Sequence, residues 1–520
     1  MAGSHKHGER RRTAAGNLQS MEPTPSPTEP TGAAQQVTPE PGPVQPAGRH
    51  VTVVGAGVSG LVAARDLARA GFRVTLVESA DRLGGQVRTI DFADRRVDVG
   101  AEAVYVRPPH LAGLVRELGL WDSAVGSHPG TTLLGHPHGA QPMPAGIGPT
   151  GPTQLMPVVR SGMLSLPGMV RAGLEPFLAR MTPPLPVDQD ISVGGFLASR
   201  FGHEVVRRFV DPMLGSLHSG DVYQLSLRGN APQLVAAAEH NKSLMLQRTP
   251  KATTSGPGFL SWTDGLQTLT NALAADIVAH GGTISTGVDV RQLARVAQGW
   301  QVRTSAGGFE TDAVVLATPT QVTADLLSLL RGSAAETLRK QRAASIANVL
   351  LAMSADQVFT HRRGDRTLLR ATPETNGILL PSDAPWTMKA ATFLTTKWPH
   401  LRLTADGRDD NTFLVRVSAG RVGRHEIDDL DDAALVAQMA DDLHRTTGIS
   451  AEVRESKVVR WPVVPQCEVG QPADVAAIRA DLARQLPTLA LAGGGIDGLG
   501  ISSVVRSGQN AARTIIDALA

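Results

Sequence analysis

From residue 50 onward, short apolar runs typical of strands alternate with segments whose apolar residues have helical spacing. Residues 50–54 and 72–79 are short runs rich in β-branched apolar residues, typical of buried parallel strands. Between them, residues 58–71 carry apolar side chains at helical spacing and end at a glycine. The pattern therefore predicts a βαβ unit over residues 50–79.

Two later segments have the same character. Residues 283–319 alternate apolar and polar positions and end in a fully apolar strand. Residues 489–516 read as a strand, a glycine-rich turn and a helix. We expect both to join the βαβ unit in one discontinuous α/β domain with a parallel sheet.

The remaining segments predict two further domains. Residues 345–354 and 410–421 alternate as strands of a mixed sheet, and residues 431–448 have the pattern of an amphipathic helix. The expected organisation is a disordered tail over 1–48, a Rossmann-type domain over 49–106, 256–320 and 455–520, a helical domain over 107–255 and a mixed-sheet substrate domain over 321–454. The tail assignment rests on its Pro-rich sequence, which has few large apolar residues to bury.

Composition excludes several classes of protein. The 50 Lys and Arg residues balance 48 Asp and Glu residues, with no basic stripe of the kind that binds nucleic acid. No apolar run is long enough to span a bilayer and no signal peptide is evident, so we predict a cytoplasmic protein without a transmembrane segment. The single cysteine, Cys467, excludes an intrachain disulfide framework. The His136–His138 pair is expected to lie in a turn, and no metal site is predicted.

The first predicted strand ends in a dinucleotide-binding motif. Gly55, Gly57 and Gly60 have the GxGxxG spacing, which allows a tight turn, backbone contact with a pyrophosphate and close packing of the helix on the strand. Glu78 ends the second strand, where a carboxylate can accept hydrogen bonds from ribose hydroxyls. A carboxylate at this position disfavours NADP, whose ribose carries a phosphate.

The continuation of the motif favours FAD. Residues 80–86, "ADRLGGQ", resemble the second glycine pair of the FAD-dependent amine oxidase superfamily, and the segments around residues 100, 290 and 500 are similar to its other cofactor contacts. The resemblance implies non-covalent FAD, with a helix N-terminus facing the flavin and stabilising negative charge on it. It adds to the four motif residues the cofactor contacts Arg82, Gly84, Gly85, Gly100, Ala101, Val290, Asp497, Gly500 and Ile501.

Within that superfamily, segments spread over residues 50–520 resemble the porphyrinogen oxidases, among them residues 97–120, 212–234, 258–269, 388–398 and 461–471. The resemblance implies oxidation of a porphyrinogen, foremost coproporphyrinogen III to coproporphyrin III in haem biosynthesis, with O2 as acceptor and H2O2 as product. Since the flavin performs the redox chemistry, a separate catalytic side-chain set is neither required nor evident.

A porphyrinogen carries carboxylates, so its pocket should present cations. The candidates are Arg107, Lys389 and Arg506. Lys389 shares the predicted strands with three other cations, Lys397, Arg416 and Arg421, and for each of the four a solvated strand face is favoured over a pocket.

The chain departs from the family pattern at several positions: Ile496, Ser502 and Arg506 in the last segment, and Cys467 and Gln471 before it. Two alternatives therefore stay open. One is a divergent paralogue, an FAD-dependent oxidase or desaturase acting on an amine or a secondary metabolite; an amine oxidase would need an aromatic cage, here from Trp398 and Trp461. The other is a flavoprotein that binds its ligand without turnover.

Overall fold

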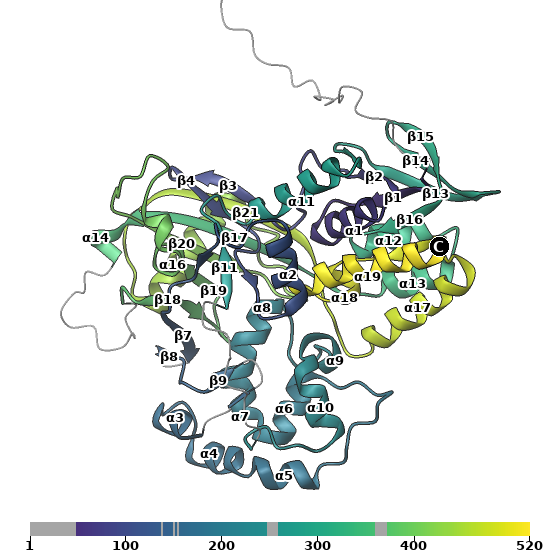
Figure 1. The fold of residues 1–520 in the computed structure, drawn as a ribbon. Coiled ribbons are helices and arrows are strands. Elements are labelled where there is room, and N and C mark those ends of the chain that lie inside the picture. Colours follow the sequence, from purple (N-terminus) through teal and green to yellow (C-terminus); the bar gives the residue numbers. More distant parts are fainter. Residues whose placement is uncertain (1–47, 137–138, 149–150, 153–154, 247–257, 359–371) are drawn as a thin grey trace, which may run out of the picture. The chain divides into compact units, whose positions relative to one another are not determined.

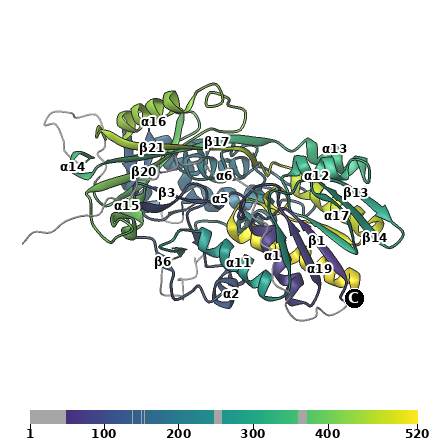
Figure 2. The same cartoon turned by 90° about the horizontal axis from the view of Figure 1, so that it is seen from above.

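The computed structural model describes residues 48–136, 139–148, 151–152, 155–246, 258–358 and 372–520, and all of these belong to one compact unit. Residues 1–47 of the predicted tail and His138 lie outside the described residues. Figure 1 shows the arrangement of the elements, and Figure 2 shows it from above.

A five-stranded, wholly parallel sheet carries the dinucleotide motif, which confirms the predicted α/β class. Its strands come from distant stretches of the chain, and the central strands β1 and β16 are fully buried. In spatial order they are β12 (Thr283–Ser285), β2 (Arg73–Val77), β1 (His50–Val54), β16 (Ala313–Leu316) and β22 (Leu489–Leu491).

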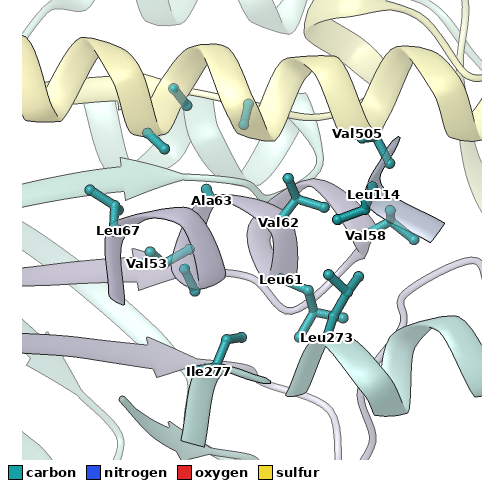
Figure 3. Packing of buried hydrophobic residues seen from close by; sticks show 14 of the residues in the cluster. Val53, Val58, Leu61, Val62, Ala63, Leu67, Leu114, Leu273, Ile277 and Val505 are labelled. Atoms are coloured by element: carbon teal, nitrogen blue, oxygen red, sulfur yellow. The ribbon is translucent and has the colours of Figure 1, made fainter. Parts of the chain in front are cut away.

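Helices cover both faces of this sheet. On one face, α1 (Val58–Arg69) packs between α19 (Ile501–Leu519) and α11 (Gln267–Ala279), joined by α2 (Pro109–Glu117). Figure 3 shows Val62 and Ala63 of α1 beneath α19, and Leu61 facing Leu273 of α11. The other face packs against α12 (Thr320–Leu327), α13 (Gly332–Arg339) and α17 (Gln471–Gln485), and against the antiparallel strands β13 (Val290–Val296), β14 (Gly299–Thr304) and β15 (Gly307–Thr311).

The second large sheet has seven strands and is mixed, and four of its strands lie within residues 321–454, where a mixed sheet is predicted. β7 and β18 pair in parallel and the other neighbours are antiparallel. In order the strands are β21 (Val453–Pro465), β17 (Ala343–Ser354), β20 (Thr412–Ala419), β19 (Met388–Phe393), β18 (Thr375–Leu379), β7 (Thr131–His136) and β8 (Gly139–Pro142). β7 and β8 come from the segment expected to be helical.

Each face of the mixed sheet is covered. The predicted helix over 431–448 is α16 (Asp432–Thr447), which begins with the Asp431 carboxylate accepting from Ala434 N at 2.8 Å. It packs against one face. The hairpin of β3 (Thr89–Phe92) and β4 (Arg95–Asp98) covers the other face, together with α15 (Leu394–Lys397) and Trp398.

Residues 155–246 are mostly helical around a separate apolar core. They form α3 (Leu155–Arg160), α4 (Leu166–Gly173), α5 (Glu175–Met181), α6 (Val193–Phe201), α7 (His203–Val205), the π-helix η1 (Val206–Gly215), α8 (Ser216–His218), α9 (Leu227–Asn230) and α10 (Val235–Glu239). Among the described residues of the whole chain, none of the helices has both the length and the apolar character needed to cross a membrane.

Candidate functional site

The three glycines of the turn between β1 and α1 have different surroundings. Gly55 has a φ of +99°, and a Cβ there would lie 2.6 Å from Ala317 O. A Cβ on Gly60 would lie 1.8 Å from Gly55 O, so only glycine lets α1 pack on the strand. A Cβ on Gly57 would meet nothing within 4 Å, so the backbone there faces open space. The turn therefore leaves room for a ligand beside Gly57.

The N-terminus of α1 is open to an anion. Gly57 is its first flanking residue, no side chain among the described residues caps it, and its first turn holds no acidic residue. Unpaired N–H groups and the helix dipole at such an end favour a bound phosphate.

A second glycine turn lies directly beside the first. Gly84 N donates to Ala56 O at 2.8 Å, and a Cβ on Gly85 would lie 3.1 Å from Gly57 Cα. Gly84 and Gly85 have φ of +102° and +58°. The two glycine turns therefore lie against each other at the N-terminus of α1 and together form a glycine-lined cradle.

Arg82 stabilises this second turn by hydrogen bonds to its backbone. Its guanidinium donates to Gly85 O at 2.8 Å and to Val87 O at 3.3 Å, and it lies 6.0 Å from the centre of the Trp461 ring. Burial lowers the pKa of Arg82. The structure therefore places Arg82 as a backbone clamp.

Glu78 closes the cradle on the side of β2. One of its carboxylate oxygens accepts from Ala56 N at 2.6 Å and the other from Ala80 N at 2.9 Å. Val288 N donates to Glu78 O at 2.9 Å, which brings the start of β13 and the buried Val290 to the same end of the sheet. A carboxylate has further lone pairs, so the predicted contact of Glu78 with a ribose fits this geometry.

The segment around Gly100 and Ala101 is fixed to the mixed sheet by side chains that donate to its backbone. Val99 O accepts from Asn348 Nδ2 at 2.8 Å and from Trp461 Nε1 at 3.1 Å. Gly100 O accepts from Arg416 at 3.0 Å. A Cβ on Gly100 would lie 1.9 Å from Gln86 O, so this close approach requires glycine.

Glu102 forms the strongest charge cluster near this segment. Its carboxylate pairs with Lys397 Nζ and, at 2.6 Å, with Arg416. Burial alone would raise the pKa of Glu102, but Arg416 and Lys397 outweigh it and lower the pKa to about 2. No local sequence pattern predicts this cluster, because its members lie on a loop after β4, at the end of α15 and on β20.

Lys389 lies in a second, cation-rich cluster. Its buried amine donates to Ser219 Oγ, and burial, with smaller effects of Arg421 and Arg416, lowers the pKa of Lys389 to about 7. Burial and Lys389 lower the pKa of His218 to about 4. Arg421 is also buried and donates to Leu380 O at 2.8 Å. Two cations expected on a solvated strand face thus lie inside the protein.

The structure does not bring the other two substrate candidates into this cluster. Arg107 is exposed in the loop between β5 (Val104–Tyr105) and α2. Arg506 is exposed on α19, with its guanidinium 3.1 Å from His110 Nδ1 of α2. Both therefore stay predictions on a different surface from Lys389.

The turn before α19 contains the last cofactor candidates. It comprises α18 (Gly494–Asp497) and leads to Gly500, which flanks the start of α19; among the described residues no side chain caps this helix N-terminus. Ile501 begins the helix and packs against the core around α1. The Asp497 carboxylate accepts from the Arg479 guanidinium at 2.8 and 2.7 Å and from Ser507 Oγ.

Two of the positions that depart from the family pattern bond to each other. Cys467 Sγ donates to Gln471 Oε1 at 3.0 Å, and Gln471 Nε2 donates to Gly495 O in the turn before α19 at 2.7 Å. Ile496 of this turn is buried, whereas Ser502 of α19 contacts His110 of α2 at 3.0 Å. Comparison of single residues could not reveal that Cys467 and Gln471 act on the turn together.

Two other expectations concern aromatic and metal sites. Trp398 is buried beneath the β3–β4 hairpin, and Trp461 donates to Val99 O, so both indoles are engaged in packing. In the described part of the chain no three His, Cys, Asp or Glu side chains gather as metal ligands. A surface pocket of about 300 Å³ contains none of the predicted site residues and is lined by Pro176, Arg180, Asn241, Lys242, Ser243 and Leu246.

The parallel sheet and its paired glycine turns are those of a dinucleotide-binding protein. The chain matches the family described as flavin containing amine oxidoreductase over residues 58–516. The coproporphyrinogen III oxidase of Mycobacterium tuberculosis (strain ATCC 25618 / H37Rv) is 31% identical over 483 residues, which cover 91% of this chain and 98% of the relative. That of Bacillus subtilis (strain 168) is 27% identical and covers 89% and 97%.

A crystal structure from Exiguobacterium sp. 255-15, provisionally named a protoporphyrinogen oxidase, has a TM-score of 0.76 at 24% identity, covering 90% of this chain and 98% of that one. The chain therefore belongs to the flavin-containing amine oxidoreductase family. It is an oxidoreductase with a flavin cofactor.

Proposed function

We propose that this protein binds FAD non-covalently and oxidises a porphyrinogen, foremost coproporphyrinogen III to coproporphyrin III, with O2 as acceptor and H2O2 as product, in haem biosynthesis. The observation that carries the proposal is the likeness along almost the whole chain to relatives named coproporphyrinogen III oxidase.

FAD in particular is supported by the residues that form the cradle and by those that lie beside it. Gly57 and Gly85 leave space for a pyrophosphate at the α1 N-terminus, and Glu78 and Val290 lie where the adenosine half would follow. The second uncapped helix N-terminus, at Gly500 and Ile501, would serve the flavin half. When bound, the flavin supplies the acceptor for the hydrogens that leave the porphyrinogen.

The chain's own task is to bind and orient the anionic macrocycle. The buried Lys389 and Arg421 and the partly buried Arg416 place cationic groups in and beside the mixed sheet, balanced in part by Glu102. Buried charge of one sign favours a substrate of the opposite sign. Lys389, Arg107 and Arg506 remain the proposed partners of its carboxylates.

The test is anaerobic mixing of the flavin-loaded protein with coproporphyrinogen III, protoporphyrinogen IX and a panel of small amines, while the flavin absorbance is followed. We expect coproporphyrinogen III to bleach it most rapidly, with porphyrin fluorescence and H2O2 appearing once air is admitted. Chromatography of the cofactor released by acid should give FAD in the supernatant.

The same assay separates the alternatives. Bleaching by an amine alone would establish a paralogue with another substrate. A flavin that no compound reduces, although photoreduction shows that it is redox-active, would establish a binding protein without turnover. Either result contradicts the proposed function.

A further inference from the structure

The turn that leads into α19 is held by a chain of hydrogen bonds from three neighbouring elements. Arg479 of α17 donates through both terminal nitrogens to the Asp497 carboxylate, at 2.8 and 2.7 Å. Ser507 of α19 is fully buried, donates to the same carboxylate and accepts from Gly493 N at 2.9 Å. Asp497 therefore ties α17, the α18 turn and the first part of α19 together.

A second set of bonds holds the same turn from the opposite side. Gly495 O accepts from Gln341 Nε2 at 2.8 Å and from Gln471 Nε2 at 2.7 Å. A Cβ on Gly495 would lie 2.5 Å from Thr320 Cγ2, so the turn has little room to move toward α12. The position of Gly500 and Ile501 is thus fixed by side chains that lie outside the turn.

The direction of the Asp497 carboxylate decides what it can do. Its oxygens face Arg479 and Ser507, and two-pronged pairing with a guanidinium is the strongest arrangement available to a carboxylate in a protein. The pair is only partly exposed, with 36% of the Arg479 side chain and 23% of the Asp497 side chain accessible. Asp497 is therefore committed to the fold of the turn, and its charge is matched by Arg479.

We propose that Arg479 is a positioning residue for the flavin: through Asp497 it fixes the turn that sets the α19 N-terminus, and it neutralises a carboxylate that lies three residues before that N-terminus. This inference rests on the proposed function for the place of the flavin beside Gly500 and Ile501. Without Arg479, the unmatched carboxylate would oppose electron density on the reduced ring. The loosened turn would also weaken cofactor binding.

The experiment compares three single variants with the wild type: Arg479→Gln, Arg479→Lys and Asp497→Asn. The double variant combines Arg479→Gln with Asp497→Asn. Arg484→Gln is the matched control, because Arg484 lies on the same helix, is 66% exposed and pairs with Asp481 at 3.5 Å. Two quantities are measured without any substrate: the Kd of FAD, by titration of the apoprotein, and the midpoint potential of the bound flavin.

We expect Arg479→Gln to raise the Kd about tenfold, as loss of a charged hydrogen-bond pair would, and to lower the potential. Asp497→Asn should raise the potential, and the double variant should return it to the wild-type value, because the two charges cancel. Arg479→Lys should recover the potential but only part of the affinity, since lysine keeps the charge without the fork. Arg484→Gln should change neither quantity.

Unchanged affinity and potential in Arg479→Gln would overturn the inference, even if the variant unfolds at a lower temperature, since that is the result of a purely structural pair. If Arg479→Gln does not fold, the potential of Asp497→Asn decides: a rise supports the inference and no change overturns it. A wild-type protein that takes up no FAD would refute the proposed function, and this inference with it.

Discussion

Lys389 is buried and the Glu102 side chain is only 12% exposed, yet their surroundings shift their pKa values for different reasons. Glu102 has two cations in contact, which lower its pKa to about 2 although burial opposes them. Lys389 has a neutral partner, Ser219, and burial together with Arg421 and Arg416 lowers its pKa to about 7. One group stabilises the fold in its charged form, and the other costs stability when charged.

Lys389→Met should therefore stabilise the protein most at low pH. The pKa of Lys389 is about 7 in the folded state and 10.5 as the unperturbed value, so between these pH values the unfolded state binds more protons and the free energy of unfolding rises with pH. We expect the free energy of unfolding of the variant to exceed that of the wild type at pH 6 by up to about 5 kcal/mol, the limit that the two pKa values set, and the difference to shrink toward pH 10. Urea unfolding at both pH values measures it.

The control for this prediction is Lys457→Met, because Lys457 is exposed on β21 of the same sheet. It should leave the free energy of unfolding almost unchanged at either pH. A stability difference between Lys389→Met and the wild type that does not vary with pH would contradict the buried-charge argument.

Glu102→Gln should destabilise the protein by about 3 kcal/mol, because it leaves the partly buried Arg416 and Lys397 without their counter-charge. In the wild type the contribution of Glu102 is present above its ordinary pKa of 4.5 and is lost as the pH falls through about 2. Thermal unfolding from pH 7 to pH 2 should show that loss in the wild type and a flatter profile in the variant.

Asp91→Asn provides the comparison, since the Asp91 side chain is 84% exposed and pairs with Arg96 at the surface. Its stability should stay within about 0.5 kcal/mol of the wild type. Equal losses of stability in Glu102→Gln and Asp91→Asn would show that the Glu102 cluster contributes no more to stability than a surface ion pair does.

Sequence reasoning worked for residues whose role is local. Gly55, Gly57 and Gly60 follow one strand directly, so their spacing alone predicted the turn that the structure shows. The Glu102–Arg416 pair could not be found in this way, because it forms only when the loop after β4 meets β20. For the same reason, the sequence alone does not predict a role for Arg479.

At the scale of elements, the crossing of α1 and α19 determines where two helix N-termini lie. Gly508 of α19 sits against Ser59, Val62 and Ala63, and a Cβ there would lie 2.3 Å from Ser59 O. Because Ser59 O is a backbone atom, it cannot move away by a change of side-chain rotamer. The close approach of the helices therefore depends on one missing side chain.

Gly508→Ala should move α19 away from α1, with a loss of about 2 kcal/mol in the free energy of unfolding from overpacking and weaker FAD binding. Gly113→Ala in α2 is the matched change, because a Cβ there meets nothing within 4 Å. It should be neutral or stabilise by about 0.5 kcal/mol, as alanine does in a helix. Equal stability and FAD affinity in both variants would refute the packing argument.

Helices and strands with a regular spacing of apolar residues were predictable. Strands that form only by pairing with a strand far away in the sequence were not. The β1–α1–β2 unit and α16 follow from their apolar spacing and their end residues. β7 and β8 lie in a segment expected to be helical and become strands because β7 pairs with β18. The π-helix η1, with Pro212 inside it, has no local signature that separates it from an ordinary helix.

For the molecule as a whole, the parallel sheet joins three separate stretches of the chain. β1 and β2 come from the first, β12 and β16 from the second and β22 from the third. The proposed cofactor contacts are distributed over the same three stretches: Gly57 and Glu78, Val290, and Gly500. The domain boundaries remain predictions, but a ligand that touches all three stretches must couple their unfolding.

FAD should therefore stabilise the whole protein, and Gly57→Ala should remove this effect selectively. Gly57 has φ −65° and ψ 172°, which alanine adopts without strain, and its Cβ would enter open space. The variant without FAD should thus unfold at the wild-type temperature. At an FAD concentration one hundred times the Kd, the wild type should gain about 2.7 kcal/mol, whereas the added methyl, lying where the pyrophosphate approaches the backbone, should abolish most of this gain. Calorimetry of both proteins with and without FAD measures it. A Gly57→Ala protein that is stabilised as much as the wild type would place the cofactor elsewhere, and with it the cradle on which the proposed function depends.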